Sequence, residues 1–136
     1  MVALAQAKAS KVREEWLKFV FLGTQPSFLA GGSWPPGSAI SSLYATLHTA
    51  DPGETGSQTT NETSYTNYLR SGGSVARSTS GWSVAAGVCD NDAPITYAAC
   101  GASGATITHF GIGSDSTSNG NLFLKGALTS SLAVSS

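Results

Sequence analysis

Charged side chains are scarce in this chain. Asp, Glu, Lys and Arg make up 11% of its 136 residues, against roughly 25% in an average globular protein. The net charge is −1, so no excess of positive charge favours binding to nucleic acid or to an anionic membrane. Serine, threonine, glycine and alanine supply much of the remainder. This composition favours β structure with many turns.

Cysteine and long apolar runs are scarce as well. Cys89 and Cys100 are the two cysteines, too few for a disulfide framework and too isolated for a zinc site. We expect two free thiols, with a disulfide between them as the alternative. No apolar stretch approaches the roughly 20 residues of a membrane-spanning helix, and the N-terminus lacks the pattern of a signal peptide. We therefore expect synthesis in a cytoplasm and no membrane partner.

Patterns that carry catalysis or metal binding are also missing from the sequence. His48 and His109 are the two histidines, and no spacing supplies the three or more converging ligands of a metal site. Asp51 and Glu54 form a possible carboxylate pair, but no apolar neighbours raise a pKa for acid catalysis. Residues 90–92 lack the later Gly and Glu of a calcium loop, and no nucleophile elbow or phosphate-binding glycine loop occurs. We expect no enzymatic activity, metal or cofactor.

The first 38 residues are predicted to form a helix and an extended docking arm. Apolar spacing predicts a helix over residues 3–21, with Leu4, Val12, Trp16, Phe19 and Val20 near one stripe. Gly23 ends this helix and Pro26 prevents its resumption. Residues 22–38 are a Gly/Pro/Ser-rich connector. The basic residues of the helix form either a solvated face or a charge-mediated docking segment.

Four aromatic residues of this arm are our candidates for contact with a partner protein. They are Trp16, Phe19, Phe28 and Trp34. Exposed aromatic side chains are frequent anchors at protein interfaces. The alternative for Trp34 is that it plugs the end of the chain's own core.

From residue 39 to residue 136 the pattern is that of a β domain. Residues 43–48 alternate between apolar and polar, which predicts a strand buried on one face, and Asp51-Pro52-Gly53 ends it in an acidic loop. Further strands are predicted over residues 64–69, 74–79, 82–88, 95–98, 106–112, 122–128 and 132–134. About seven short strands separated by turns indicate a mainly β fold, an antiparallel two-sheet β-sandwich.

Five segments of the chain follow one another in an order that is typical of a known family. They are Leu43–Gly56, Asn61–Arg70, Trp82–Val84, Ile107–Ile112 and Asn121–Leu128. With them the chain resembles, from residue 12 to residue 136, a family of small tailed-bacteriophage virion proteins. Its members are often labelled tail fibre proteins, and some resemble head decoration, or cement, proteins. The resemblance implies a β-sandwich structural subunit without enzymatic activity.

The resemblance also implies a function. We expect a capsid decoration protein, located in the virion on the outer capsid surface, which bridges major capsid protein subunits as a homotrimer. Residues 1–38 would dock it, so removal of residues 1–34 is expected to leave a folded β domain that no longer binds capsids. The alternative is a tail-tip or tail-fibre-associated structural protein, and a small hydrolase is a third class.

One segment of the arm carries a separate hypothesis. Family members usually continue past residue 136 into one more strand, and Thr24–Phe28 has a sequence similar to part of that strand. Open sheet edges accept additional strands. We therefore expect residues 24–30 to lie along a sheet edge of the same or a neighbouring subunit.

Overall fold

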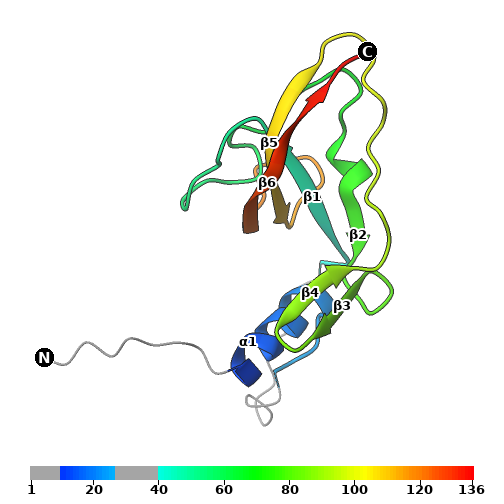
Figure 1. Ribbon diagram of the computed structural model, residues 1–136. Helices are drawn as coiled ribbons and strands as arrows, with labels where there is room; N and C mark the ends of the chain where they lie inside the picture. Colours follow the sequence, from blue (N-terminus) through cyan, green and yellow to red (C-terminus); the bar gives the residue numbers. More distant parts are fainter. Residues whose placement is uncertain (1–9, 27–39) are drawn as a thin grey trace, which may run out of the picture. The chain divides into compact units, whose positions relative to one another are not determined.

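The computed structural model of the chain describes residues 10–26 and 40–136. Two helical elements come first in the order of the chain: α1 (Ser10–Leu17) and the π-helical turn η1 (Lys18–Leu22). The remaining elements are β1 (Ser42–His48), the 3-10 turn η3 (Arg70–Gly73), β2 (Ser74–Ala76), β3 (Trp82–Ala85), β4 (Val88–Asn91), β5 (Ala105–Gly113) and β6 (Leu122–Val134) (Figure 1).

The chain divides into two compact units. One joins the N-terminal helical segment to residues 76–93, and the other joins residues 42–75 to residues 94–136. Four strands form one sheet in the order β2-β1-β5-β6, and β3 and β4 form a two-stranded sheet. The predicted mainly β fold with two antiparallel sheets and an N-terminal helix is confirmed. Whether residues 1–38 and 39–136 fold separately stays a prediction.

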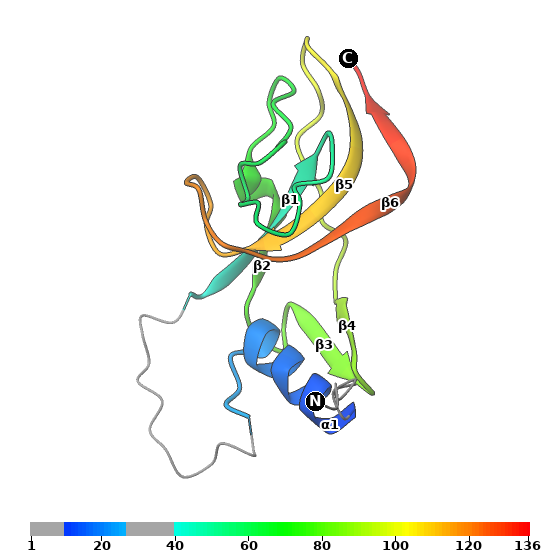
Figure 2. The same cartoon turned by 90° about the vertical axis from the view of Figure 1, so that its left-hand side faces the viewer.

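The larger sheet is built around β1 and β5. Their antiparallel register pairs Tyr44 with Gly113 and His48 with His109. β5 also pairs with β6, with irregularities between Ile107 and His109 and again after Ile112, and Figure 2 shows both strands curving. Extra residues on one strand bend it and increase its twist. The two strands predicted over 122–128 and 132–134 are therefore one bent strand.

Strand β1 is buried on both faces, contrary to the one-sided burial predicted from its alternation. Leu43 and Ala45 are buried as expected, but Thr46 and His48 are completely buried as well. Buried polar side chains require hydrogen-bond partners, and these come from each other and from a loop described below. The alternation identified the strand correctly but not its covered polar face.

Residues 64–69 and 95–98 do not form the predicted strands. Tyrosine hydroxyls reach β1 from these segments instead: Tyr97 donates to the carbonyl oxygen of Ala45 at 2.8 Å, and Tyr68 accepts from the Leu47 amide at 3.3 Å. Aromatic and β-branched residues give a strand-like pattern. Here side-chain hydroxyls, rather than a backbone ladder, satisfy those groups of β1.

The segment predicted as one strand over residues 82–88 is a hairpin. Ala86 and Gly87 form its two-residue turn with φ angles of 50° and 75°, the double left-handed conformation of the turns preferred in tight hairpins. β4 runs through Asn91, which pairs with Trp82, so strand structure continues beyond the predicted end at residue 88. Larger and smaller side chains alternate throughout residues 82–88, so the pattern predicted one continuous strand and gave no sign of this turn.

The helical segment packs on this hairpin through a residue outside the predicted stripe. Phe21 is 2% exposed, and its ring centroid lies 4.6 Å from that of Trp82. A π-helical turn has hydrogen bonds to the fifth residue rather than the fourth, so it changes the face that a 3.6-residue period predicts. Gly23 then ends the helix with φ 70°, as predicted. Arg77 donates to the carbonyl oxygens of Phe19 and Val20 at this end.

Candidate functional site

A buried ion pair joins the loops beside the larger sheet. Arg70 is 6% exposed, and its Nε and Nη2 donate to the two carboxylate oxygens of Glu62 at 2.9 and 2.5 Å. Its Nη1 donates to the carbonyl oxygens of Asp115 and Ser118 at 3.1 and 2.6 Å. The hydrogen bond with Glu62 raises the pKa of Arg70. One guanidinium thus holds the loop of residues 114–120 against the segment of residues 62–70.

Tyr68 extends this network to β1. Its hydroxyl donates to Glu62 Oε1 at 2.9 Å while it accepts from the Leu47 amide. Burial raises the pKa of Tyr68 far above its usual value, and burial also raises the pKa of Tyr97. Both phenols therefore stay protonated at neutral pH. A protonated phenol in fixed hydrogen bonds positions a loop but supplies no base.

Gln58 ties a second loop to the first. It is fully buried, and its amide exchanges two hydrogen bonds with the backbone of Asp115, at 2.9 and 3.2 Å. Glycines leave room for it: a Cβ at Gly113 would lie 2.2 Å from Gln58 Cδ, and one at Gly120 2.3 Å from Oε1. Asn119 Oδ1 also accepts hydrogen bonds from residues of the Gln58 loop. We call residues 57–70 and 114–120, linked in this way, the loop cluster.

His48 is packed within the sheet and hydrogen-bonded at both ring nitrogens. Nδ1 lies 2.9 Å from the carbonyl oxygen of Thr60, which can only accept, so Nδ1 carries the proton and Nε2 accepts from Thr46 Oγ1 at 2.8 Å. Burial lowers the pKa of His48. The described residues contain no group of three or more His, Cys, Asp and Glu side chains placed to bind a metal ion.

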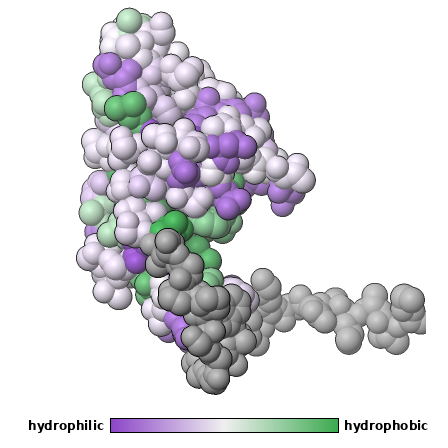
Figure 3. Space-filling view, turned by 180° about the vertical axis from the view of Figure 1, so that it is seen from behind, coloured by the Kyte–Doolittle hydropathy of each residue, from purple (hydrophilic) through white to green (hydrophobic). Residues whose placement is uncertain are grey.

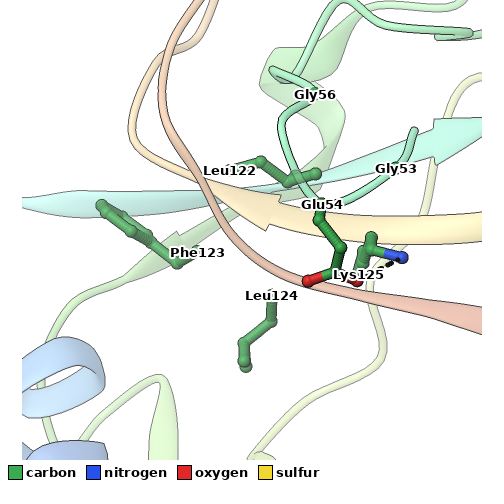
Figure 4. Close-up of a pocket in the computed structure, with 7 residues that line it drawn as sticks. All are labelled: Gly53, Glu54, Gly56, Leu122, Phe123, Leu124 and Lys125. Atoms are coloured by element: carbon green, nitrogen blue, oxygen red, sulfur yellow. Dashed lines mark ion pairs between the residues drawn. The ribbon is translucent and has the colours of Figure 1, made fainter.

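The two carboxylates considered from the sequence both pair with one lysine. Lys125 Nζ lies 2.9 Å from Asp51 Oδ1 and 3.2 Å from Glu54 Oε1. Hydrogen bonds from the Gly53 amide and from Lys125 lower the pKa of Asp51, which is the wrong direction for an acid catalyst. The ion pairs border a shallow hollow of about 100 Å³. Figure 4 shows Phe123 and Leu124 extending away from Glu54 and Lys125.

A second hollow, of about 360 Å³, lies on the loop cluster. Its lining includes Glu62, Tyr65, Tyr68 and Arg70, together with Leu69, which is 67% exposed. The carboxylate and guanidinium in its wall already bind each other.

Both cysteines are free thiols, and burial raises the pKa of Cys89 to about 11.

Several large apolar side chains lie exposed on the larger sheet. Phe110 of β5 is 38% exposed, and on β6 Phe123, Leu124 and Leu132 are 40%, 45% and 55% exposed. Figure 3 shows hydrophobic residues interrupting the polar surface of one face of the protein. The sequence predicted these strands but not the open position of their side chains. The uninterrupted apolar triplet at residues 122–124, with which β6 begins, was the available signal.

Two of the four predicted contact residues lie close together on the helical segment. Trp16 is 38% exposed, and its ring packs edge to face with that of Phe19 at 5.9 Å. The Arg77 guanidinium lies 5.7 Å from the centre of the Phe19 ring. Phe28 and Trp34 lie outside the described residues, as does most of the segment 24–30, so their roles stay predictions.

Within the described ranges, no helix is long and apolar enough to cross a membrane.

Comparison with protein families gives the class of this β-rich chain: it is a structural protein of tailed-phage virions. The family model that matches is described as podophage GP4 fiber I protein gp80, and it covers residues 29–136. The match takes in most of the chain, which therefore belongs to this family. No curated protein matches the chain. The resemblance to phage virion proteins is confirmed at this level.

Proposed function

We propose that the protein is a fibre-associated structural subunit of the phage virion, without enzymatic activity and without a cofactor. The observation that carries this proposal is the family match, which extends over the whole larger sheet and the loop cluster. The virion of a phage must survive outside the cell. Loops held together by hydrogen bonds and a buried ion pair suit a protein that must keep its shape there. The partners in this role are other virion proteins, not nucleic acid or membrane.

A second candidate function is capsid decoration by a trimer that bridges major capsid protein subunits on the outer surface of the shell. The exposed ring of Trp16, beside Phe19 on the helical segment, favours it. A tryptophan at the surface is a frequent anchor for a protein partner. In this role the added contacts would stabilise the lattice to which the protein binds.

Copy number in purified virions distinguishes the two functions. Quantitative mass spectrometry against the major capsid protein is the measurement, and gold-labelled antibodies in electron microscopy give the position. The fibre proposal predicts far fewer copies than capsid subunits, with label at the tail. Near-parity with the capsid protein and label over the head would overturn it in favour of decoration.

Trp16→Ala tests the docking role independently of location. Because this ring is exposed, the substitution should leave the far-ultraviolet circular dichroism spectrum unchanged. We expect weaker incorporation into particles assembled from the variant, while Leu69→Ala, at a more exposed apolar position, serves as the matched control. Equal incorporation of both variants would remove Trp16 from the contact.

A further inference from the structure

The loop of residues 114–120 ends in the one Asn-Gly pair of the sequence, Asn119-Gly120. An asparagine loses its side-chain amide most readily when glycine follows it, because glycine has no Cβ to hinder the approach of its nitrogen to the asparagine side chain. Asn119 is exposed and Gly120 is half-buried, so water reaches the pair. The pair is therefore a candidate site of chemical modification.

Two hydroxyl groups converge on the side-chain oxygen of Asn119. Ser57 Oγ and Thr59 Oγ1 both donate to Oδ1, at 2.5 Å each. Donors fixed on an oxygen stabilise the negative charge that develops there when a nucleophile attacks the adjacent carbon. In an Asn-Gly pair that carbon is Cγ of the asparagine, and the nucleophile is the backbone nitrogen of the glycine. The Gln58 loop thus places two donors on the group that would react.

The backbone nitrogen of Gly120 is not held by a hydrogen bond. Among the described residues it donates to no acceptor, whereas the following amide, that of Asn121, does donate. The carbonyl groups around it are held. Arg70 Nη1 donates to the carbonyl oxygen of Ser118 at 2.6 Å, and the Gln58 amide donates to that of Gly120 at 3.2 Å. The loop is therefore fixed on both sides of a nitrogen that is free to react.

We propose that Asn119 deamidates in the folded protein, with Ser57 and Thr59 as the donors that promote the reaction. Hydroxide from the solvent takes the amide proton of Gly120, and the nitrogen bonds to Asn119 Cγ. The Cγ–Nδ2 bond breaks as ammonia leaves with a proton from water. Water then opens the cyclic imide at either carbonyl, which gives aspartate or isoaspartate. The reaction needs only water and does not depend on where in the virion the protein lies.

Isoaspartate at position 119 would loosen the loop cluster. Its main chain runs through the side-chain carbon atoms, which adds a methylene group to the backbone before Gly120. The carbonyl oxygens of Ser118 and Gly120 could then not both stay in place on Arg70 and Gln58. Aspartate, by contrast, leaves the backbone unchanged and still accepts from both hydroxyls. Ageing of the protein would thus act on the contacts that hold these loops.

Proteolysis and tandem mass spectrometry of the full-length protein, aged at neutral pH, test this inference. Asn119 should be converted while Asn121, two residues further along the chain, stays intact. Ser57→Ala and Thr59→Val should each slow the conversion roughly tenfold, the effect of one hydrogen bond to a charged group. Thr117→Val is the matched control: it removes a hydroxyl of the same loop that is not a donor to Asn119, so its rate should equal that of the wild type.

Unfolding in guanidinium chloride separates the reactivity of the Asn-Gly pair from the effect of the fold. It removes both donors, so Asn119 should be converted more slowly in the unfolded protein than in the folded one. Circular dichroism verifies that each variant is folded. Faster conversion in the unfolded protein would overturn the inference, and so would an intact Asn119 or equal rates for the wild type and both donor variants.

The effect on the loops is measured by urea unfolding of the aged protein. Its isoaspartate fraction should unfold at a lower urea concentration than Asn119→Asp, which carries the new charge without the added methylene group. Equal midpoints would refute the loosening of the loop cluster.

Discussion

Removal of the Arg70 side chain is the most direct test of how the loops are held. The side chains of Arg70 and Glu62 are 5% and 14% exposed, so Arg70→Ala leaves a carboxylate with little access to water. The carbonyl oxygens of Asp115 and Ser118 lose their donor at the same time. Breaking a buried ion pair by removing one partner costs about 3–5 kcal/mol. We expect a loss of that size in the free energy of unfolding.

Urea unfolding followed by far-ultraviolet circular dichroism measures this loss. With a typical slope for a small protein, it corresponds to a fall of roughly 2 M in the urea midpoint. Lys125→Ala is the matched control, because it also removes a cation from its carboxylate partners, here Asp51 and Glu54, but at the surface. Exposed ion pairs contribute little to stability, so the control should unfold close to the wild type.

A second substitution separates the unpaired charge from the lost contacts. Glu62→Gln, added to Arg70→Ala, removes the buried negative charge while it keeps an acceptor for the Tyr68 hydroxyl. The double variant should therefore be more stable than Arg70→Ala alone, which is a coupling that a double-mutant cycle measures. Arg70→Ala and Lys125→Ala with equal midpoints would refute the reasoning, since burial would then make no difference.

Three further predictions concern other parts of the chain. Burial lowers the pKa of His48 below its ordinary 6.5. The contribution of the neutral imidazole to stability is therefore complete above pH 6.5 and is lost as the pH falls through the lower, folded-state pKa. The urea midpoint should fall between pH 7.5 and pH 5, and it should fall less in His48→Gln. Ala86→Asn should relieve the strain of a positive φ angle and so increase the free energy of unfolding by about 0.5–1 kcal/mol. The melting temperature should rise accordingly, and an unchanged or lower melting temperature would contradict the turn assignment. Phe21→Ala should cost about 3–5 kcal/mol and shift tryptophan emission to longer wavelengths as Trp82 becomes exposed; unchanged emission would contradict their packing.

The packing of Phe21 also changes what a deletion of residues 1–34 is expected to show. Phe21 covers Trp82, and Arg77 binds the carbonyl oxygens at the end of the helical segment. Removing that segment uncovers the hairpin at the same time as it removes the docking arm. Lost binding after deletion would then have two causes. Trp16→Ala is the cleaner perturbation because its ring is exposed.

Sequence patterns identified the elements in which apolar residues recur with the period of a strand or a helix. The strand at β1, the strand at β5 and the glycine that ends the helix were predicted close to their observed positions. The turn at Ala86-Gly87 was missed because alanine has no marked turn preference, and its φ angle follows from the pairing of the flanking strands. The π-helical turn was missed because it departs from the 3.6-residue period on which helix prediction depends.

The loop cluster lay beyond prediction for a different reason. Gln58, Glu62 and Arg70 are residue types that lie mostly at the surface, and their burial depends on partners up to 57 residues away in the chain. No local pattern encodes such partners. The exposed aromatic and leucine side chains of β5 and β6 pose the opposite difficulty, since apolar residues in a strand are normally expected to be covered.

The loop of residues 114–120 is rich in Ser, Asn and Gly and would ordinarily be chosen for inserting an epitope tag or a fluorescent label. Its hydrogen bonds with Gln58 and Arg70 make it a poor choice, because an insertion there would break the contacts that hold two other loops in place. The acidic loop after β1 is the better place. Gly53 has open space around it, and the side chain of Glu54 is 92% exposed. A label carried there would leave the contacts of Gln58 and Arg70 in place.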